Sequence, residues 1–211
     1  MFSHPVFLKA PHSKLQRMLK KIVILGPEST GKSTLCQQLA EHYKTLWCPE
    51  FAREYLLTNG TKYTYDDLLT IAKGQLALED EYVEKIRKTE IAQNQKMDSA
   101  LSPSRPSPGL LFIDTDMYVM KVWCEFVFGN CHRFILDKIV ERKYDLYLLC
   151  NIDLPWIQDP LREYPDPAPR RQLYAIYKDS MVNQAVPWVD IHGNYEKRLQ
   201  TAIMHVDKLL A

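Results

Sequence analysis

The 211-residue sequence lacks any apolar run that approaches the roughly 18 residues needed for a membrane-spanning helix. It also lacks an excess of charge of one sign, since the formal net charge is +1, and nothing favours nucleic acid as a partner. Its five cysteines are odd in number and include no C-x-x-C pair, which disfavours a disulfide scaffold or a zinc site. These absences predict a cytoplasmic protein, and the length suits one domain with a full core.

The first twenty residues lack acidic side chains but carry Lys9, Lys14, Arg17 and Lys20. Such a bias is typical of transit peptides, yet this stretch has little amphipathic pattern and no apolar region of a secretory signal. We therefore expect residues 1–20 to be a flexible extension and residues 21–211 to form the domain.

One stretch, GPESTGKS at residues 26–33, fits the pattern G-x-x-x-x-G-K-[ST] at every specified position. It follows the short β-branched run of residues 21–25, which is typical of a buried parallel strand. After it, Leu35, Leu39 and Tyr43 recur every four residues, on one face of a helix. Strand, glycine loop and helix thus occur in the order that a phosphate-binding loop (P-loop) requires.

The loop predicts a site for a nucleoside triphosphate. Its backbone N–H groups, with the positive end of the following helix, would bind phosphate oxygens. Lys32 would reach the β- and γ-phosphates, Ser33 would ligate Mg²⁺, and Thr34 can donate to the α-phosphate. The predicted nucleotide-binding residues of the loop are Gly26, Glu28, Ser29, Thr30, Gly31, Lys32, Ser33 and Thr34.

Predicted strands and helices alternate along the rest of the chain. Such alternation indicates an α/β protein with right-handed crossovers, here a three-layer P-loop fold with a five-stranded parallel sheet and a lid segment. The Ser- and Pro-rich stretch 99–109 is expected to be a surface loop. The strands are expected at residues 21–25, 45–48, 110–113, 146–150 and 188–191.

The longest predicted helix follows Thr64. An acid three positions later, Asp67, completes a helix-start signal with that residue. Apolar residues then recur at helical spacing to about Met97, and Gly74 is expected to be a weak point in the helix.

Acidic residues follow two of the predicted strands, at Glu50 and at Asp114 and Asp116. Ligands gather at the carboxyl ends of parallel strands, so these positions would face the γ-phosphate. Phosphoryl transfer needs a carboxylate near the acceptor hydroxyl and an acid that organises Mg²⁺. Glu50 and Asp114 are the candidates, with the choice of general base open and with Asp114 and Ser33 as the expected metal ligands. Asp116 is equally well explained as the cap of the next helix.

The charged segment from Asp159 to Arg171 contains four prolines, which forbid a continuous helix, so we expect a mobile lid. A helix is expected to begin near Pro169. An arginine that closes over the transferring group stabilises the charge on its oxygens. Arg162 is the main candidate for this catalytic role, and Arg170 and Arg171 are predicted to contact the nucleotide.

Two other classes of P-loop protein fit less well. A GTPase needs N-K-x-D after a later strand, whereas residues 151–154 read NIDL. A hexameric ATPase needs a longer module with its own helical subdomain. Small nucleoside and nucleotide kinases remain.

Four blocks together resemble the ribosylnicotinamide kinase domain of NadR-type proteins. They are GPESTGKST (26–34), EFARE (50–54), FIDTD (112–116) and PWIQDPLR (155–162), the last of which is similar to that family's W-x-x-D-x-x-R lid entry. The resemblance extends from about Lys21 to the C-terminus. It implies ATP- and Mg²⁺-dependent phosphorylation of the 5′-hydroxyl of nicotinamide riboside to nicotinamide mononucleotide. The family's adenylyltransferase motif, H-x-G-H, has no counterpart, so we expect the kinase module alone.

The implied acceptor carries a cationic ring, which favours aromatic faces or an acid in its pocket. The predicted substrate-binding residues are Glu50, Arg53, Glu54, Tyr55, Asp114, Asp116, Tyr118 and Trp156. Trp123, on an apolar helix, is better explained by core packing. Two alternatives stay open, namely a kinase for another nucleoside or vitamin-like alcohol, and a nucleotide-sensing module with little turnover. We expect no nucleic acid or membrane partner.

Overall fold

The computed structural model describes residues 19–97 and 109–211. Most of the predicted extension (residues 1–20) and of the predicted 99–109 loop lies outside these residues. The strands are β1 (Lys20–Leu25), β2 (Leu46–Cys48), β3 (Leu110–Asp114), β4 (Leu146–Cys150) and β5 (Trp188–Ile191). The helices are α1 (Lys32–Tyr43), α2 (Phe51–Asn59), α3 (Tyr65–Met97), α4 (Met117–Phe128), α5 (Arg133–Glu141), α6 (Pro167–Val182) and α7 (Tyr195–Leu210).

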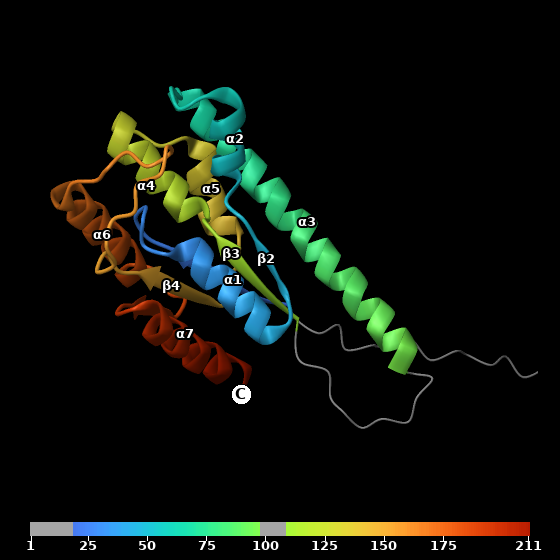
Figure 1. Cartoon of the computed structure of the whole chain (residues 1–211). Coiled ribbons are helices and arrows are strands. Elements are labelled where there is room, and N and C mark those ends of the chain that lie inside the picture. The colour runs from blue at the N-terminus through green and yellow to red at the C-terminus, as the bar shows by residue number, and fades with distance from the viewer. Residues whose placement is uncertain (1–18, 98–108) are drawn as a thin grey trace, which may run out of the picture.

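The five strands form one parallel sheet in the order β2-β3-β1-β4-β5, with the strand that leads into the P-loop at its centre. Side chains of β1 alternate between two cores, with Ile22 and Ile24 on one face and Val23 and Leu25 on the other. Helices α1 and α7 cover the first face, and α3, α4 and α6 cover the second (Figure 1). The predicted three-layer α/β fold is confirmed, and burial on both faces explains why these strands are apolar throughout.

The start of α3 confirms the predicted capping signal. The Asp67 carboxylate accepts from Thr64 N at 2.7 Å, and the Thr64 hydroxyl accepts from Asp67 N at 3.3 Å. The helix continues through Gly74, the predicted weak point, to Met97. A Cβ on Gly74 would lie 2.2 Å from the Phe51 ring, so the glycine allows α2 to pack closely against α3.

Helix α6 begins earlier than predicted. Its first residue is Pro167 rather than a residue near Pro169, so the second half of the predicted lid is helical. Both prolines lie in the first turn, where backbone N–H groups have no intrahelical acceptor and a missing N–H costs little. The irregular part is therefore residues 155–166, which we call the lid segment.

All five cysteines are free thiols, and four of them are buried. In the described ranges 19–97 and 109–211, the helices all fall short of the length or apolarity that a bilayer span requires.

Candidate active site

The loop between β1 and α1 has the backbone shape of an anion site. Gly26 has φ +134°, and a Cβ there would lie 2.6 Å from the Cys150 carbonyl oxygen, so only glycine fits. Gly31 is the N-cap of α1, and no described side chain caps the first N–H groups of that helix. These groups can therefore bind phosphate oxygens. Lys32 Nζ donates to the Pro27 carbonyl at 2.9 Å, which holds the ammonium group against the loop.

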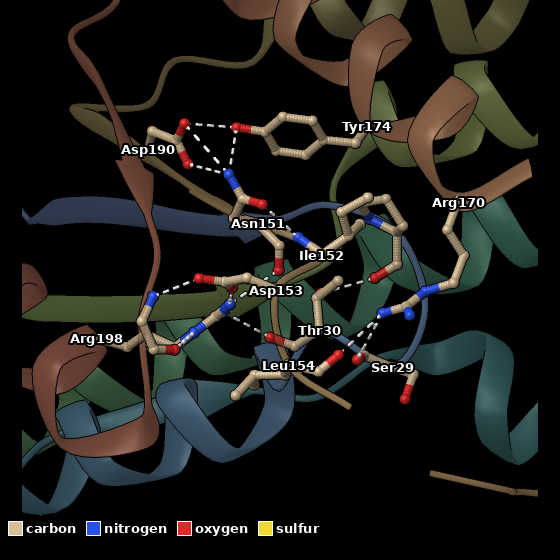
Figure 2. Close-up of polar contacts among 12 residues, drawn as sticks. Ser29, Thr30, Asn151, Ile152, Asp153, Leu154, Arg170, Tyr174, Asp190 and Arg198 are labelled. Carbon is tan, nitrogen blue, oxygen red and sulfur yellow. Dashed lines mark hydrogen bonds and ion pairs between the residues drawn. The ribbon is translucent and has the colours of Figure 1, made fainter. Parts of the chain in front are cut away.

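Two buried arginines hold the carbonyl groups of the loop (Figure 2). Arg198, on α7, donates to the Thr30 carbonyl at 2.9 Å, to the Asn151 carbonyl at 2.9 Å and also to the Asp153 carboxylate. Arg170, on α6, reaches the Ser29 carbonyl through a longer bond of 3.4 Å. The two guanidinium groups thus fix the orientation of successive peptide groups in the loop.

The sequence predicted that Arg170 and Arg171, both on α6, contact the nucleotide. Arg170 is buried and does not line the cavity, and its guanidinium group lies 5.4 Å from the ring centre of Trp156. Arg171 is exposed and also lies outside the cavity lining. Arg170 therefore contacts the backbone of the loop rather than the cavity, and a contact of either arginine with the nucleotide stays a prediction.

A serine and two carboxylates meet beside the P-loop. Ser33 Oγ donates to Asp114 Oδ2 at 2.5 Å, and Glu50 lies nearby at the start of α2. Asp114 is 1% exposed, and its Oδ1 has no hydrogen-bond partner in the described part of the chain. Burial, followed by the charge of Asp114, raises the pKa of Glu50, and burial raises the pKa of Asp114. The nearby Lys32 ammonium opposes both shifts.

The pair Ser33 and Asp114 fits a magnesium ion. Hydroxyl and carboxylate oxygens are the ligands that Mg²⁺ prefers, and the unpaired Asp114 Oδ1 is a buried acceptor that a cation would satisfy. Within residues 19–97 and 109–211, no three His, Cys, Asp or Glu side chains lie close enough together to hold a metal ion. A site with two protein ligands, completed by phosphates and water, is the usual arrangement for Mg²⁺.

A cavity of about 510 Å³ extends from the loop past these carboxylates. This volume lies in the range of small-molecule sites. The predicted site residues that line it are Gly26, Glu28, Ser29, Thr30, Gly31, Lys32, Ser33, Thr34, Glu50, Arg53, Asp114 and Arg162. The structure therefore brings the predicted phosphate-side residues together in one cavity.

One wall of the cavity is aromatic, and three of its four residues, Tyr63, Phe126 and Tyr164, were not predicted. Trp123 Nε1 donates to the Tyr63 hydroxyl at 2.8 Å, and the two ring centres are 4.9 Å apart. Phe126 and Tyr164 pack edge to face with their ring centres 5.3 Å apart. All four residues line the cavity, and Trp123 also packs against the buried cluster formed by α2, α3, α4 and α5, as the sequence predicted. Its spacing of four residues from Val119, on a helix that starts beside the site, was an available signal.

Five predicted substrate-binding residues lie outside the cavity lining: Glu54, Tyr55, Asp116, Tyr118 and Trp156. Glu54 is exposed, and the Tyr55 hydroxyl donates to Asp67 at 2.6 Å. The Asp116 carboxylate caps α4 by accepting from Tyr118 N at 3.0 Å and from Val119 N at 3.3 Å. The Tyr118 ring packs on Tyr147, and Trp156 lies beside Arg162 of the lid segment and Arg170 of α6. The geometry thus gives Asp116 a structural role.

The lid segment lies over the cavity. Asp159 pairs with Arg53 of α2 at 2.9 Å, and Arg162 donates to the Ile157 carbonyl within the segment. Ile157 N donates to the Ser29 hydroxyl of the P-loop at 2.9 Å. The lid segment thus contacts both α2 and the P-loop.

A central parallel strand, a glycine loop with free N–H groups and a buried acid on the adjacent strand define a P-loop nucleotide-binding domain. A family model described as an AAA domain (AAA_28) matches residues 21–198, and the chain belongs to that family. The description concerns the domain and not its assembly, so the expectation against a hexameric ATPase stays a prediction.

The resemblance to NadR-type proteins is confirmed by the relatives. The chain is 24% identical over 193 residues to the trifunctional NAD biosynthesis/regulator proteins NadR of Salmonella typhimurium and of Escherichia coli. These matches cover 91% of this chain and 43% of each relative, so the chain spans less than half of their length.

Solved structures show the same fold. A NadR protein in complex with NR superimposes with a TM-score of 0.66 at 21% identity, over 90% of this chain and 49% of that one. Thymidylate kinase from Ehrlichia chaffeensis superimposes with a TM-score of 0.57 at 14% identity, over 89% and 98% of the two chains. The fold is therefore that of P-loop kinases.

Proposed function

We propose that residues 21–211 form a kinase that transfers the γ-phosphoryl group of ATP to the 5′-hydroxyl of nicotinamide riboside in the presence of Mg²⁺. The observation that carries this proposal is the single cavity that a P-loop, two carboxylates and an aromatic wall line together. These three groups suit a donor phosphate, the reacting oxygen and a flat base, respectively.

The residues on the phosphate side would bind and neutralise the donor. The loop N–H groups and Lys32 would hold the phosphates, while Ser33 and Asp114 would hold Mg²⁺. When bound, the ion supplies charge neutralisation between the β- and γ-phosphates. Arg162, which lines the cavity from the lid segment, would add a guanidinium group to the transferring phosphoryl oxygens.

Glu50 is the proposed general base. Asp114 is already bonded to Ser33, whereas Glu50 lines the cavity at the start of α2. A carboxylate whose pKa is raised by burial accepts a proton near neutral pH more readily than an ordinary glutamate. The structure therefore favours Glu50 over Asp114 for activation of the acceptor hydroxyl.

Four observations support nicotinamide riboside as the acceptor. The relatives are named for NAD biosynthesis, and a solved NadR structure contains NR. The aromatic wall of Tyr63, Trp123, Phe126 and Tyr164 offers ring faces to a cationic base. The carboxylate of Glu163 also lines this part of the cavity and adds negative charge.

The free thiols fit a reducing cytoplasm as the site of action.

The test is a panel of acceptors assayed for ADP release with ATP and Mg²⁺. Nicotinamide riboside, thymidine, cytidine, adenosine and pyridoxal would be compared by kcat/KM, with a parallel reaction in EDTA. We expect nicotinamide riboside to exceed the others by at least tenfold and EDTA to abolish release. A preference for another acceptor would reassign the substrate. Binding of ATP without release for any acceptor would indicate a nucleotide-sensing module.

A further inference from the structure

The carboxylate of Glu28 faces the lid segment, although Glu28 belongs to the P-loop. Its Oε1 accepts from Tyr164 N at 2.5 Å and from Glu163 N at 2.9 Å, and its Oε2 lies 3.1 Å from Glu163 N. One carboxylate thus binds two successive backbone amides of a segment that has no regular secondary structure. Bonds from amides to an ionised acceptor are stronger than those between neutral groups.

The two amides belong to residues that contact the aromatic wall. The Tyr164 ring packs edge to face on Phe126, at 5.3 Å between ring centres. The Glu163 carboxylate accepts from the Tyr63 hydroxyl at 2.9 Å, and Tyr63 in turn accepts from Trp123. A continuous set of contacts therefore leads from the P-loop to all four rings of the aromatic wall.

We propose that Glu28 is a positioning residue for the acceptor, although it lies in the loop that binds the donor. This inference deepens the proposed function and rests on it. The loop binds phosphate through N–H groups and Lys32, and a carboxylate adds only repulsion toward a polyphosphate. Glu28 instead holds the lid backbone in register, so that Tyr164 and Glu163 keep their places in the wall.

The expected kinetic effect lies on the acceptor side. In Glu28→Ala the two amides lose their acceptor and the wall loses one of its supports, so KM for nicotinamide riboside should rise on the order of tenfold. KM for ATP should change less than twofold. Glu28→Gln keeps an oxygen that can accept from both amides but removes the charge, so its effect should be clearly smaller than that of Glu28→Ala.

Glu41→Ala is the matched control, because Glu41 is an exposed acid of α1 outside the cavity lining. It should leave both KM values unchanged. If Glu28→Ala raises KM for ATP as much as KM for the riboside, the residue serves the donor and the inference is wrong. If Glu28→Gln matches Glu28→Ala, charge and not the amide contact matters, which also overturns it.

A second measurement is independent of the substrate. Trypsin cleavage after Arg162 should be about tenfold faster in Glu28→Ala than in wild type without any ligand, and Glu28→Gln should be intermediate. Equal rates in wild type and Glu28→Ala would overturn the positioning role even if the kinase reaction is confirmed. Faster cleavage in a protein that phosphorylates no nucleoside would instead contradict the proposed function alone.

Discussion

In the phosphate half of the cavity, one short stretch of chain joins a central strand to a helix, and two buried arginines hold its carbonyl groups from α6 and α7. The acceptor half brings together α2, α4, the loop of residues 60–64 and the lid segment. Its helices share a buried cluster, but the lid segment is joined to α2 and to Tyr63 by bonds between exposed side chains. The first half is thus held by buried arginines, whereas the second half is closed by exposed contacts of the lid segment. We infer that donor binding is fixed by the fold and that acceptor choice is set by contacts that are easily altered.

The largest effect should come from the phosphate half. Lys32→Ala removes the only loop side chain able to meet the β- and γ-phosphates, so activity should fall below a few per cent of wild type. The melting temperature should stay within about 2 °C, because the Lys32 side chain bonds only to the Pro27 carbonyl among the described residues. Residual activity above that level would show that the donor sits elsewhere.

The carboxylates between the two halves come next. Glu50→Gln should lower kcat at least a hundredfold while the Kd for ATP changes little, because the base acts mainly in the transition state. Single-turnover rates and calorimetric ATP binding would measure the two quantities. A variant that keeps wild-type kcat would exclude Glu50 as the base.

A substitution in the acceptor half should separate the two substrates. Trp123→Ala should raise KM for nicotinamide riboside about tenfold and leave KM for ATP unchanged, since Trp123 belongs to the aromatic wall and its indole N–H bonds to Tyr63 rather than to the P-loop. Trp156→Ala is the matched control, because Trp156 lies outside the cavity lining, and its effect on the riboside should be smaller. A larger effect for Trp156 would restore the role that the sequence indicated.

The smallest predicted effect concerns stability. Burial raises the pKa of Asp116 from 3.8 to about 7. Between pH 3.8 and pH 7 its carboxyl group is therefore mostly protonated in the folded state and mostly ionised in the unfolded state. This group therefore contributes stability at low pH that is lost as pH rises toward 7. Asp116→Asn keeps the oxygen that caps α4 without this titration.

The melting temperature of Asp116→Asn minus that of wild type should therefore be higher at pH 8 than at pH 5. Thermal unfolding of the metal-free protein at both pH values measures this difference. The same difference in melting temperature at both values would contradict the shifted pKa.

The fold and the phosphate half were predictable because their signals are local. A doubly buried strand needs an unbroken apolar run, a phosphate loop needs glycine at Gly26 and Gly31, and a helix start needs a cap such as Thr64. Each of these requirements acts within a few residues, so the sequence displays it directly.

The acceptor half was predicted poorly because its signals depend on tertiary structure. An apolar helix face such as that of Trp123 looks the same whether it faces a core or a cavity. Proline in the first turn of α6 resembles proline in a loop, so the predicted lid extended to Arg171 although α6 begins at Pro167. The contacts of Arg198 join segments far apart in the chain, and nothing local marks them.

The most direct measurement is the identity of the product formed from ATP, Mg²⁺ and nicotinamide riboside, by mass spectrometry and phosphorus–proton NMR coupling. The proposed function predicts one new compound, the riboside carrying a single phosphoryl group on its 5′-oxygen, formed in equal amount to ADP and absent with Lys32→Ala. Release of ADP with unchanged riboside, or a phosphoryl group on any other oxygen, would contradict it.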